Sequence, residues 1–205
     1  MMKRKDINPS WIILASASPR RAALLRGLGW TFTVEPANVD EVIVAGETPE
    51  ETAARLASAK AGHVERMHPK ALGLAADTLV VCDDVVLGKP RDTDDAFSML
   101  RLLSGRKHRV VTGVAVWWNG KHASGVESTI VEFRELSDAA IRTYLDGNES
   151  MDKAGAYAIQ DFGSLLVRRI EGCYFNVVGL PLALLSELLA ETGVPVEYQW
   201  GMGSC

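Results

Sequence analysis

Residues 14–21, with the sequence LASASPRR, combine the residue types that bind a phosphate group. They join an expected strand, a serine-rich turn and the start of an expected helix, where free backbone N–H groups attract anions. The hydroxyl of Ser18 can donate a hydrogen bond, and the planar guanidinium of Arg21 can bind two phosphate oxygens at once. The alternative is a capped surface helix with two solvated arginines, because junctions of this kind are common.

Two acidic residues could hold a divalent cation. Glu41 lies in an expected loop, and Asp77 follows the apolar residues 71–76. Side chains at strand ends often bind ligands in open α/β sheets, and two carboxylates suit Mg²⁺, which also binds substrate phosphates. Lys60, on an expected helix, and Lys89, after an expected strand, could neutralise phosphate charge. Taken singly, each of these charged residues is more often a solvated surface residue.

Several common signatures of enzymes and metal sites are missing. The sequence contains no P-loop, no H-E-x-x-H zinc motif and no G-x-S-x-G nucleophile motif, and its four histidines lack the spacing of metal ligands. The three cysteines, Cys82, Cys173 and Cys205, form no C-x-x-C pair. They therefore predict neither a zinc site nor a disulfide framework, and they fit a reducing cytosol.

The composition is typical of a globular protein. The chain has 205 residues, enough for one sizeable domain or two small lobes, of which 47% are hydrophobic and 23% charged. Its net charge of −4 argues against a nucleic-acid polymer as a partner, because such binders usually carry a basic excess. No apolar run approaches the ~20 residues that span a bilayer, and no apolar signal segment follows the basic start. We therefore expect a cytoplasmic protein without a membrane partner.

Segments typical of strands and of helices alternate along the chain, which predicts an α/β architecture. The expected strands cover residues 11–14, 71–76, 79–81, 85–87, 110–118, 124–133 and 164–170. The expected helices run from Ser18 and Pro19 to Gly27 or Gly29, from Thr48 to Arg66, from Thr93 to Gly105, from Ser137 to Gly147, and from Pro181 to Thr192. Two turns, Asp83-Asp84 and Asn119-Gly120, are expected to join neighbouring strands as hairpins.

Eight short motifs follow one another over nearly the whole chain. They are LASASPRR (14–21), VDE (39–41), AKA (59–61), ADT (76–78), GKPR (88–91), LSG (103–105), DKAGAYAIQ (152–160) and VGLP (178–181). Each motif is weak alone, but the set in this order is specific. The chain resembles the Maf family of nucleoside triphosphate pyrophosphatases.

This resemblance implies a fold and an activity. The fold would be α/β, a twisted mixed β-sheet with flanking helices, in a single domain over residues 1–205 with two lobes around a central cleft. Residues 1–10 and 196–205 would be terminal tails. The activity would be hydrolysis of the α–β phosphoanhydride of a nucleoside triphosphate, which gives a monophosphate and pyrophosphate. A homodimer is also implied.

The resemblance also implies roles for single residues. Ser18, Arg21, Lys60 and Lys89 would bind phosphate oxygens. Glu41 and Asp77 would hold Mg²⁺ or Mn²⁺, and Asp77 would be the catalytic residue, as a base or as a metal ligand.

Three further positions divide the family by substrate. They are occupied here by Arg20, Thr78 and Gln160, a set that resembles the branch acting on dTTP and UTP. The branch acting on 7-methyl-GTP tends to carry Trp, Gln and Glu at these positions. One departure from the family pattern stands beside them, because Asp161 follows Gln160 where a glycine is usual.

Two other functions remain open on the sequence alone. The first is a related house-cleaning pyrophosphatase for non-canonical purine nucleotides such as inosine triphosphate, against which the three specificity positions argue. The second is a non-catalytic regulator of septum formation, a process to which the family has been tied. The intact set of phosphate and metal residues argues that catalysis is retained.

Overall fold

The computed structural model describes residues 11–147 and 150–202, so the expected tail over residues 1–10 lies outside the described part. The strands are β1 (Ile12–Leu14), β2 (Thr33–Val34), β3 (Leu72–Cys82), β4 (Val85–Leu87), β5 (Lys107–Trp118), β6 (Lys121–Phe133) and β7 (Val167–Glu171). The helices are α1 (Pro19–Gly27), α2 (Pro49–Glu65), α3 (Thr93–Leu103), α4 (Asp138–Gly147), α5 (Tyr174–Val178), α6 (Leu182–Thr192) and α7 (Val196–Gln199), with the 3₁₀ turns η2 (Ala154–Ala156) and η3 (Asp161–Leu165).

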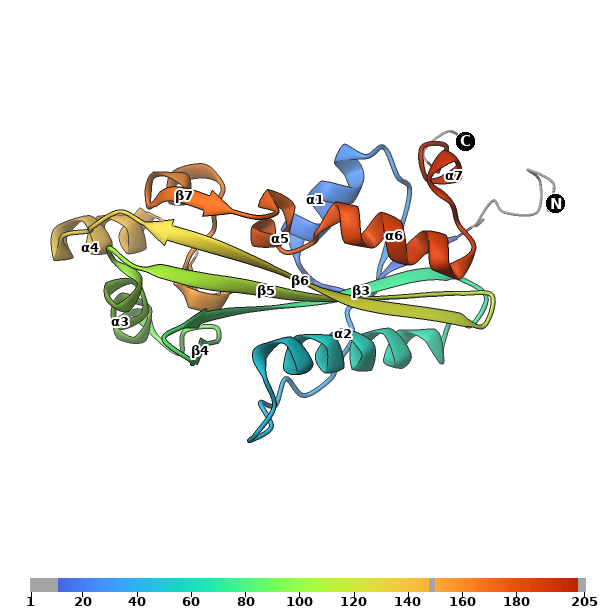
Figure 1. Ribbon diagram of the computed structural model, residues 1–205, viewed down its shortest axis with the longest axis horizontal. Coiled ribbons are helices and arrows are strands. Elements are labelled where there is room, and N and C mark those ends of the chain that lie inside the picture. The colour runs from blue at the N-terminus through green and yellow to red at the C-terminus, as the bar shows by residue number, and fades with distance from the viewer. Residues whose placement is uncertain (1–10, 148–149, 203–205) are drawn as a thin grey trace. The chain divides into compact units, whose positions relative to one another are not determined.

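The seven strands form one mixed sheet with flanking helices (Figure 1). Its order is β2-β1-β3-β5-β6-β7, and β4 pairs with β3. Strand β1 runs parallel to both β2 and β3, whereas β6 and β7 are antiparallel. The α/β class with a mixed sheet, expected from the sequence, is therefore confirmed. None of the helices in the described part is both long and apolar enough to cross a membrane.

The chain divides into two compact units. Among the described residues, unit 1 contains 11–77, 112–126 and 179–202, and unit 2 contains 78–111 and 127–178. Strands β3, β5 and β6 each contribute residues to both units. The single domain with a central cleft, implied by the family resemblance, stays a prediction.

In unit 1, successive strand residues face opposite helix layers, as the two-residue period of a strand requires. Helix α2 covers one face of the sheet, and helices α1 and α6 cover the other (Figure 1). The core toward α1 and α6 includes Ile12, Leu14, Leu72, Leu74, Val114 and Val116. The core toward α2 includes Ile13, Ala75, Ala115 and Trp117. Both faces are apolar, which is typical of a sheet buried between helices.

Helix α2 begins at a capping box and lies very close to the sheet. The side chain of Thr48 accepts a hydrogen bond from the backbone N–H of Glu51, and the Glu51 carboxylate accepts one from the Thr48 N–H. Further along, Gly113 of β5 meets the helix backbone at Ala53, where a Cβ on the glycine would lie 2.2 Å from the Ala53 carbonyl oxygen. A side chain at Gly113 would push α2 away, so the helix rests on the sheet backbone itself.

A second glycine lies under the only fully buried tryptophan side chain among the described residues. A Cβ on Gly73 of β3 would lie 1.9 Å from the indole of Trp117 on β5. Glycine is therefore required at this position for the ring to cover the strand. Residues 117 and 118 form the tryptophan pair of β5, of which the second is half-exposed.

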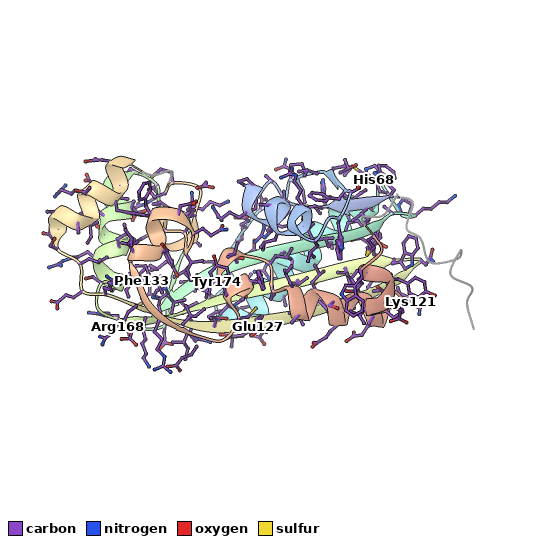
Figure 2. The ribbon with its side chains drawn as sticks, turned by 90° about the horizontal axis from the view of Figure 1, so that it is seen from above. His68, Lys121, Glu127, Phe133, Arg168 and Tyr174 are labelled. Carbon is purple, nitrogen blue, oxygen red and sulfur yellow. The ribbon has the colours of Figure 1, made fainter. Side chains whose placement is uncertain are left out.

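The core of unit 2 is formed by strand residues and by helices α3 and α4. Phe133, labelled in Figure 2, contacts the rings of both His108 and Tyr157 edge-on. His108 is almost fully buried and shares a hydrogen bond of 2.7 Å with the Tyr157 hydroxyl. Burial lowers the pKa of His108 to about 4, so this histidine is neutral at physiological pH.

The two expected hairpin turns are confirmed. Asp83 and Asp84, between β3 and β4, have φ angles of 47° and 64°, and Asn119 and Gly120, between β5 and β6, have φ angles of 51° and 73°. Two successive residues with positive φ are typical of the turns that match the right-handed twist of paired strands. The helix after Ser137 is also confirmed, since that hydroxyl accepts a hydrogen bond from the N–H of Ala140.

Two expected strands have wrong boundaries. The strands expected separately over residues 71–76 and 79–81 form one continuous strand, β3, which runs from Leu72 through Asp77 to Cys82. The residues after Asp77 are rich in β-branched types, which favour an extended backbone, and the Asp77 charge has a partner. The strand expected over residues 164–170 begins later, at Val167, because η3 occupies the preceding turn.

Further differences occur at element ends. Helix α3 is capped by Asp92, whose carboxylate accepts a hydrogen bond from the N–H of Asp95, and not by Thr93. Strand β6 begins at Lys121, directly after the turn, and not at Ser124. The sequence did not predict β2, α5 or α7, and α7 lies within the segment expected as a C-terminal tail.

Candidate active site

The turn between β1 and α1 carries the expected anion-binding residues. Ser18 caps helix α1, and its hydroxyl accepts a hydrogen bond of 3.5 Å from the backbone N–H of Arg21. Pro19 occupies the first turn of the helix, where its missing N–H costs nothing. Arg20 is half-buried beside it. The helix start predicted from the sequence is thus confirmed, and it directs backbone N–H groups away from the helix.

Arg21 is buried, and the structure fixes the plane of its guanidinium. Its Nε donates a hydrogen bond of 2.7 Å to the carbonyl oxygen of Gly179, and its Nη1 donates one of 2.9 Å to the hydroxyl of Ser16. Burial lowers the pKa of Arg21 to about 10, and the charge on Asp77 opposes this shift. The group is therefore still charged at neutral pH. The alternative of a solvated surface arginine is wrong for Arg21.

Lys60, Asp77 and Glu41 form a compact charged cluster in unit 1. The Lys60 ammonium, on α2, donates hydrogen bonds of 2.5 Å to Oδ1 of Asp77 and of 2.6 Å to Oε1 of Glu41. Lys60 and Asp77 are buried, whereas the Glu41 side chain is 44% exposed. The structure thus brings together the two carboxylates that the sequence singled out, and it places the expected phosphate ligand Lys60 between them.

The position of Asp77 differs from the expected one. Its side chain projects from the middle of β3, on the face that α2 covers, and not from the end of a strand. Within the part of the chain that the structure describes, its second carboxylate oxygen, Oδ2, accepts no hydrogen bond. One oxygen of Asp77 therefore accepts a hydrogen bond from a cation, and the other accepts none from the described residues.

The two carboxylates could take part in binding a divalent metal ion. Among the described residues, no group of three or more His, Cys, Asp or Glu side chains could hold a metal by itself. Glu41 and Asp77, however, both bind the same small cationic group. Mg²⁺ and Mn²⁺ prefer oxygen ligands, and Mg²⁺ is commonly held by one or two carboxylates together with substrate phosphates. The donor set fits such an ion.

The remaining predicted residues belong to unit 2. Thr78 of β3 and Gln160, just before η3, are half-buried, and Lys89 is exposed after β4. A backbone hydrogen bond of 3.0 Å from the N–H of Gly155 to the carbonyl of Gly88 joins the GKPR motif to the DKAGAYAIQ motif. Two motifs that lie far apart in the sequence are thus side by side.

The histidines have structural partners. His68, labelled in Figure 2, pairs with Glu35 at 2.6 Å, and His122 pairs with Glu65 at 2.8 Å. His108 contacts Tyr157, as described above. The interpretation of satisfied or exposed side chains fits His68 and His122, whereas His108 is buried and its Nδ1 has no hydrogen-bond partner among the described residues. His63 is half-buried.

Comparison with known proteins identifies the family. A family model described as Maf-like protein matches residues 11–192. The chain belongs to the Maf family.

Several Maf relatives cover almost the same length. A dTTP/UTP pyrophosphatase of Syntrophomonas wolfei subsp. wolfei (strain DSM 2245B / Goettingen) is 51% identical over 185 residues, which cover 89% of this chain and 98% of the relative. One of Moorella thermoacetica (strain ATCC 39073 / JCM 9320) is 50% identical over 194 residues, covering 94% and 98%. One of Pyrococcus furiosus (strain ATCC 43587 / DSM 3638 / JCM 8422 / Vc1) is 46% identical over 178 residues, covering 87% and 93%.

Two residues of the Maf motifs were missed by sequence reasoning. Ser16 and the carbonyl of Gly179 both hold the guanidinium of Arg21. The signal was present, because Ser16 belongs to LASASPRR and Gly179 to VGLP. A main-chain carbonyl carries no residue type, however, and so the second contact has no signature in the sequence beyond the motif itself.

Proposed function

We propose that this Maf protein hydrolyses dTTP and UTP to the nucleoside monophosphate and pyrophosphate. Relatives that are about half identical over nearly their whole length carry the name dTTP/UTP pyrophosphatase. The observation that carries the proposal within this chain is the buried Asp77, of which one oxygen is held by Lys60 while the other accepts no hydrogen bond from the described residues. An ion pair with a purely structural role would not require one carboxylate oxygen to be without a hydrogen-bond donor.

In this proposal, unit 1 binds the triphosphate and activates water. Arg21, whose guanidinium is fixed in orientation, and Ser18 at the start of α1 bind phosphate oxygens, and the family motif GKPR assigns the same role to Lys89. Asp77 accepts a proton from a water molecule. As that water's oxygen bonds to phosphorus, the α–β bridging P–O bond breaks and pyrophosphate leaves with the bonding electrons. Lys60 holds the orientation of the Asp77 carboxylate through its hydrogen bond to Oδ1.

A divalent ion completes the proposed site. Glu41 and Asp77 would hold Mg²⁺ or Mn²⁺, which when bound neutralises phosphate charge and makes a coordinated water a better nucleophile. The carboxylates and Lys60 together then determine how much negative charge the site presents to the substrate.

We assign base recognition to Gln160, with Thr78 and Arg20 at the other specificity positions. The Gln160 amide offers a donor and an acceptor, which can pair with the O4 and N3–H edge that uracil and thymine share. Cytosine presents the reversed pattern. A site built for one pattern leaves buried polar groups unpaired with the wrong base, which produces strong discrimination. Asp161, in the left-handed region at φ 52°, adds a negative charge beside this amide.

A substrate panel tests the proposal. We expect the wild-type protein with Mg²⁺ or Mn²⁺ to release pyrophosphate and monophosphate from dTTP and UTP with kcat/KM at least tenfold above the values for CTP, GTP, ITP and 7-methyl-GTP. Gln160→Glu serves as a companion variant that changes the amide and keeps its size. Equal cleavage of CTP or 7-methyl-GTP would show that the pyrimidine assignment is wrong, and preference for ITP would favour the purine house-cleaning function. No pyrophosphate from any nucleotide would overturn the enzymatic proposal.

A further inference from the structure

The loop that carries Glu41 is bound to helix α2 by Arg55. The Arg55 guanidinium donates a hydrogen bond of 2.7 Å from Nε to Oε1 of Glu47 and another of 2.7 Å from Nη2 to Oε2 of the same carboxylate. Its Nη2 also donates a hydrogen bond of 2.8 Å to the main-chain carbonyl of Val42, which follows Glu41 directly in the sequence. One side chain of α2 thus binds both ends of the segment from residue 42 to residue 47.

The Glu47 carboxylate is held from two positions on α2. Besides the two hydrogen bonds from Arg55, its Oε2 accepts one of 3.0 Å from the hydroxyl of Thr52, a residue that is almost fully buried. The hydrogen bonds from Arg55 lower the pKa of Glu47, so this carboxylate is ionised at neutral pH. A paired contact between a guanidinium and a carboxylate fixes their relative orientation as well as their distance. Glu47 therefore anchors the loop to the helix.

The apolar side chains of this loop contribute little to its position. Val42, Ile43 and Val44 are 58%, 51% and 45% exposed, so much of their surface remains in water. A segment with few buried apolar contacts opens easily unless other interactions hold it. We therefore attribute the path of the loop to its polar contacts with α2.

Arg55 and Lys60 bind neighbouring parts of the same loop. Lys60 lies five residues further along α2, roughly one and a half turns, and donates a hydrogen bond of 2.6 Å to the Glu41 carboxylate. The Glu41 side chain is 44% exposed, so packing alone does not fix its position. Because Arg55 holds the main chain at the next residue, Val42, it restricts where the Glu41 carboxylate can lie.

We propose that Arg55 is a positioning residue, which holds the loop at Val42 and Glu47 and thereby places the Glu41 carboxylate where it can bind the divalent ion of the substrate complex. The proposal rests on the function proposed above, in which Glu41 is a ligand of Mg²⁺ or Mn²⁺. Arg55 acts through Glu41 and not by its own contact with the substrate. It lies outside the eight sequence motifs, and its contacts in the structure are what reveal this role.

The experiment separates metal-dependent binding from metal-independent binding. The probe is a UTP analogue in which a methylene group replaces the α–β bridging oxygen, so that this bond cannot be hydrolysed. Calorimetry gives its Kd in Mn²⁺ and in EDTA, and the ratio of the two values is the gain in affinity due to the metal ion. Arg55→Met removes the donors and keeps an unbranched side chain, whereas Arg55→Lys keeps the positive charge without the planar pair of donors.

Arg101→Met is the matched control. Arg101, on α3, also contacts a carboxylate and a main-chain carbonyl, namely Oδ1 of Asp138 at 3.4 Å and the oxygen of Leu136 at 3.2 Å. The control variant therefore loses contacts of the same kind in unit 2, whereas Glu41 belongs to unit 1. Glu41→Gln is the reference for loss of the carboxylate itself.

We expect Arg55→Met to lower the metal-dependent gain in affinity about tenfold and to leave the Kd in EDTA within twofold of the wild type. A tenfold loss corresponds to a loop that places Glu41 correctly in roughly one molecule in ten. Arg55→Lys should recover only part of the gain, Glu41→Gln should lose most of it, and Arg101→Met should equal the wild type. In a Glu41→Gln background, Arg55→Met should have no further effect, because both changes act through the same carboxylate.

An unchanged metal-dependent gain in Arg55→Met would overturn the proposal. So would an equal loss of affinity in Mn²⁺ and in EDTA, which is the result of a general structural role. If the wild type shows no metal-dependent gain, Glu41 holds no metal ion and the proposal fails as well. If the gain falls as expected but UTP releases no pyrophosphate, the proposed enzymatic function fails while the role of Arg55 stands.

Circular dichroism and thermal unfolding show whether each variant is folded. If Arg55→Met does not fold, Glu47→Gln takes its place in the same measurements, because it removes the charge that Arg55 binds and leaves the arginine unchanged. The same two results, an unchanged gain or an equal loss in Mn²⁺ and in EDTA, would then overturn the proposal.

Discussion

The ammonium of Lys60 donates a hydrogen bond of 2.5 Å to Oδ1 of Asp77. The two residues come from different elements, α2 and β3, and both are buried. An unpaired charge in such a place is costly, because burial removes its hydration and no partner compensates. The contact therefore gives the buried Asp77 carboxylate a partner of opposite charge inside unit 1. Glu41, which lies in an exposed loop, accepts a second hydrogen bond from the same Lys60 nitrogen.

Asp77→Asn is expected to abolish most turnover and to leave the fold intact. The amide oxygen of asparagine can still accept the hydrogen bond from Lys60, so the packing is kept. The negative charge that a water proton or a metal ion needs is lost. The measurement is kcat for UTP together with the thermal unfolding midpoint. Retention of more than about a tenth of the wild-type kcat, a loss below ~1.4 kcal/mol of barrier, would contradict the catalytic role.

Lys60→Met is expected to lower the free energy of unfolding by about 3 kcal/mol, because it leaves the buried Asp77 carboxylate without a partner. The double variant Lys60→Met/Asp77→Asn should lose less than the two single variants together, since the uncompensated charge is gone. Urea unfolding at pH 7.5 measures all three. Glu41→Gln is the matched comparison and should cost less, because the Glu41 side chain is 44% exposed. Strictly additive losses would show that the Lys60–Asp77 pair contributes nothing.

Arg21→Ala is expected to raise KM for the triphosphate and to lower kcat, at a cost of roughly 1.5–3 kcal/mol in kcat/KM. Arg21→Lys should recover little. A single ammonium cannot reach the Gly179 carbonyl and the Ser16 hydroxyl in the geometry of Nε and Nη1 and still present a planar pair of donors. Steady-state kinetics with UTP give the answer. Wild-type kinetics in both variants would place Arg21 outside the substrate site.

His108 predicts a pH dependence of the stability of unit 2. Burial lowers its pKa from 6.5 to about 4, so the unfolded chain binds a proton between these values and the folded chain does not. The stabilisation is complete above pH 6.5 and is lost as the pH falls toward 4, by up to about 3 kcal/mol. His108→Gln should remove this part of the slope in urea unfolding from pH 7.5 to 4.5. Equal slopes in wild type and His108→Gln would contradict the prediction.

Gly113→Ala is expected to reduce both stability and turnover. The new methyl group would lie 2.2 Å from the Ala53 carbonyl oxygen, so α2 must move, and Lys60 moves with it. We expect a loss of 1–3 kcal/mol in the free energy of unfolding, the usual range for an overpacked core. Gly27→Ala, in α1 with no atom within 4 Å of the new Cβ, is the control and should be neutral or slightly stabilising. Equal stability and equal kcat for Gly113→Ala and wild type would rule out the close packing.

The sequence predicted the elements with local signals and missed those without. The capping box at Thr48, the Asn119-Gly120 turn and the glycine at position 193 each act within a few residues, and the structure has all three. Strand β2 has only two exposed residues, so no period-two pattern could reveal it. Asp77 interrupted the apolar pattern of β3, and its charge is compensated by the distant Lys60, a partner that the sequence does not reveal.

The same distinction holds for the site. Residue types and motif order identified Arg21, Glu41, Asp77 and Lys60, and the structure places all four in unit 1. Which of them touch could not be read from spacing, because Lys60 and Glu41 are brought together by the path of a loop. The Ser16 hydroxyl accepts a hydrogen bond from Arg21 because a tight turn brings the two residues together. The sequence motif does not specify the geometry of that turn.

The backbone-to-backbone contact between Gly113 and Ala53 also limits how this protein can change during evolution. Where a helix packs on side chains, substitutions that change the size of those side chains shift or tilt the helix. The functional residues on that helix then move with it. At this contact no side chain lies between α2 and β5. Substitutions of core residues therefore cannot easily change how deeply Lys60 is buried. Selection would then act on loops such as the one that carries Glu41, while the arrangement of Lys60 and Asp77 beneath α2 is inherited unchanged.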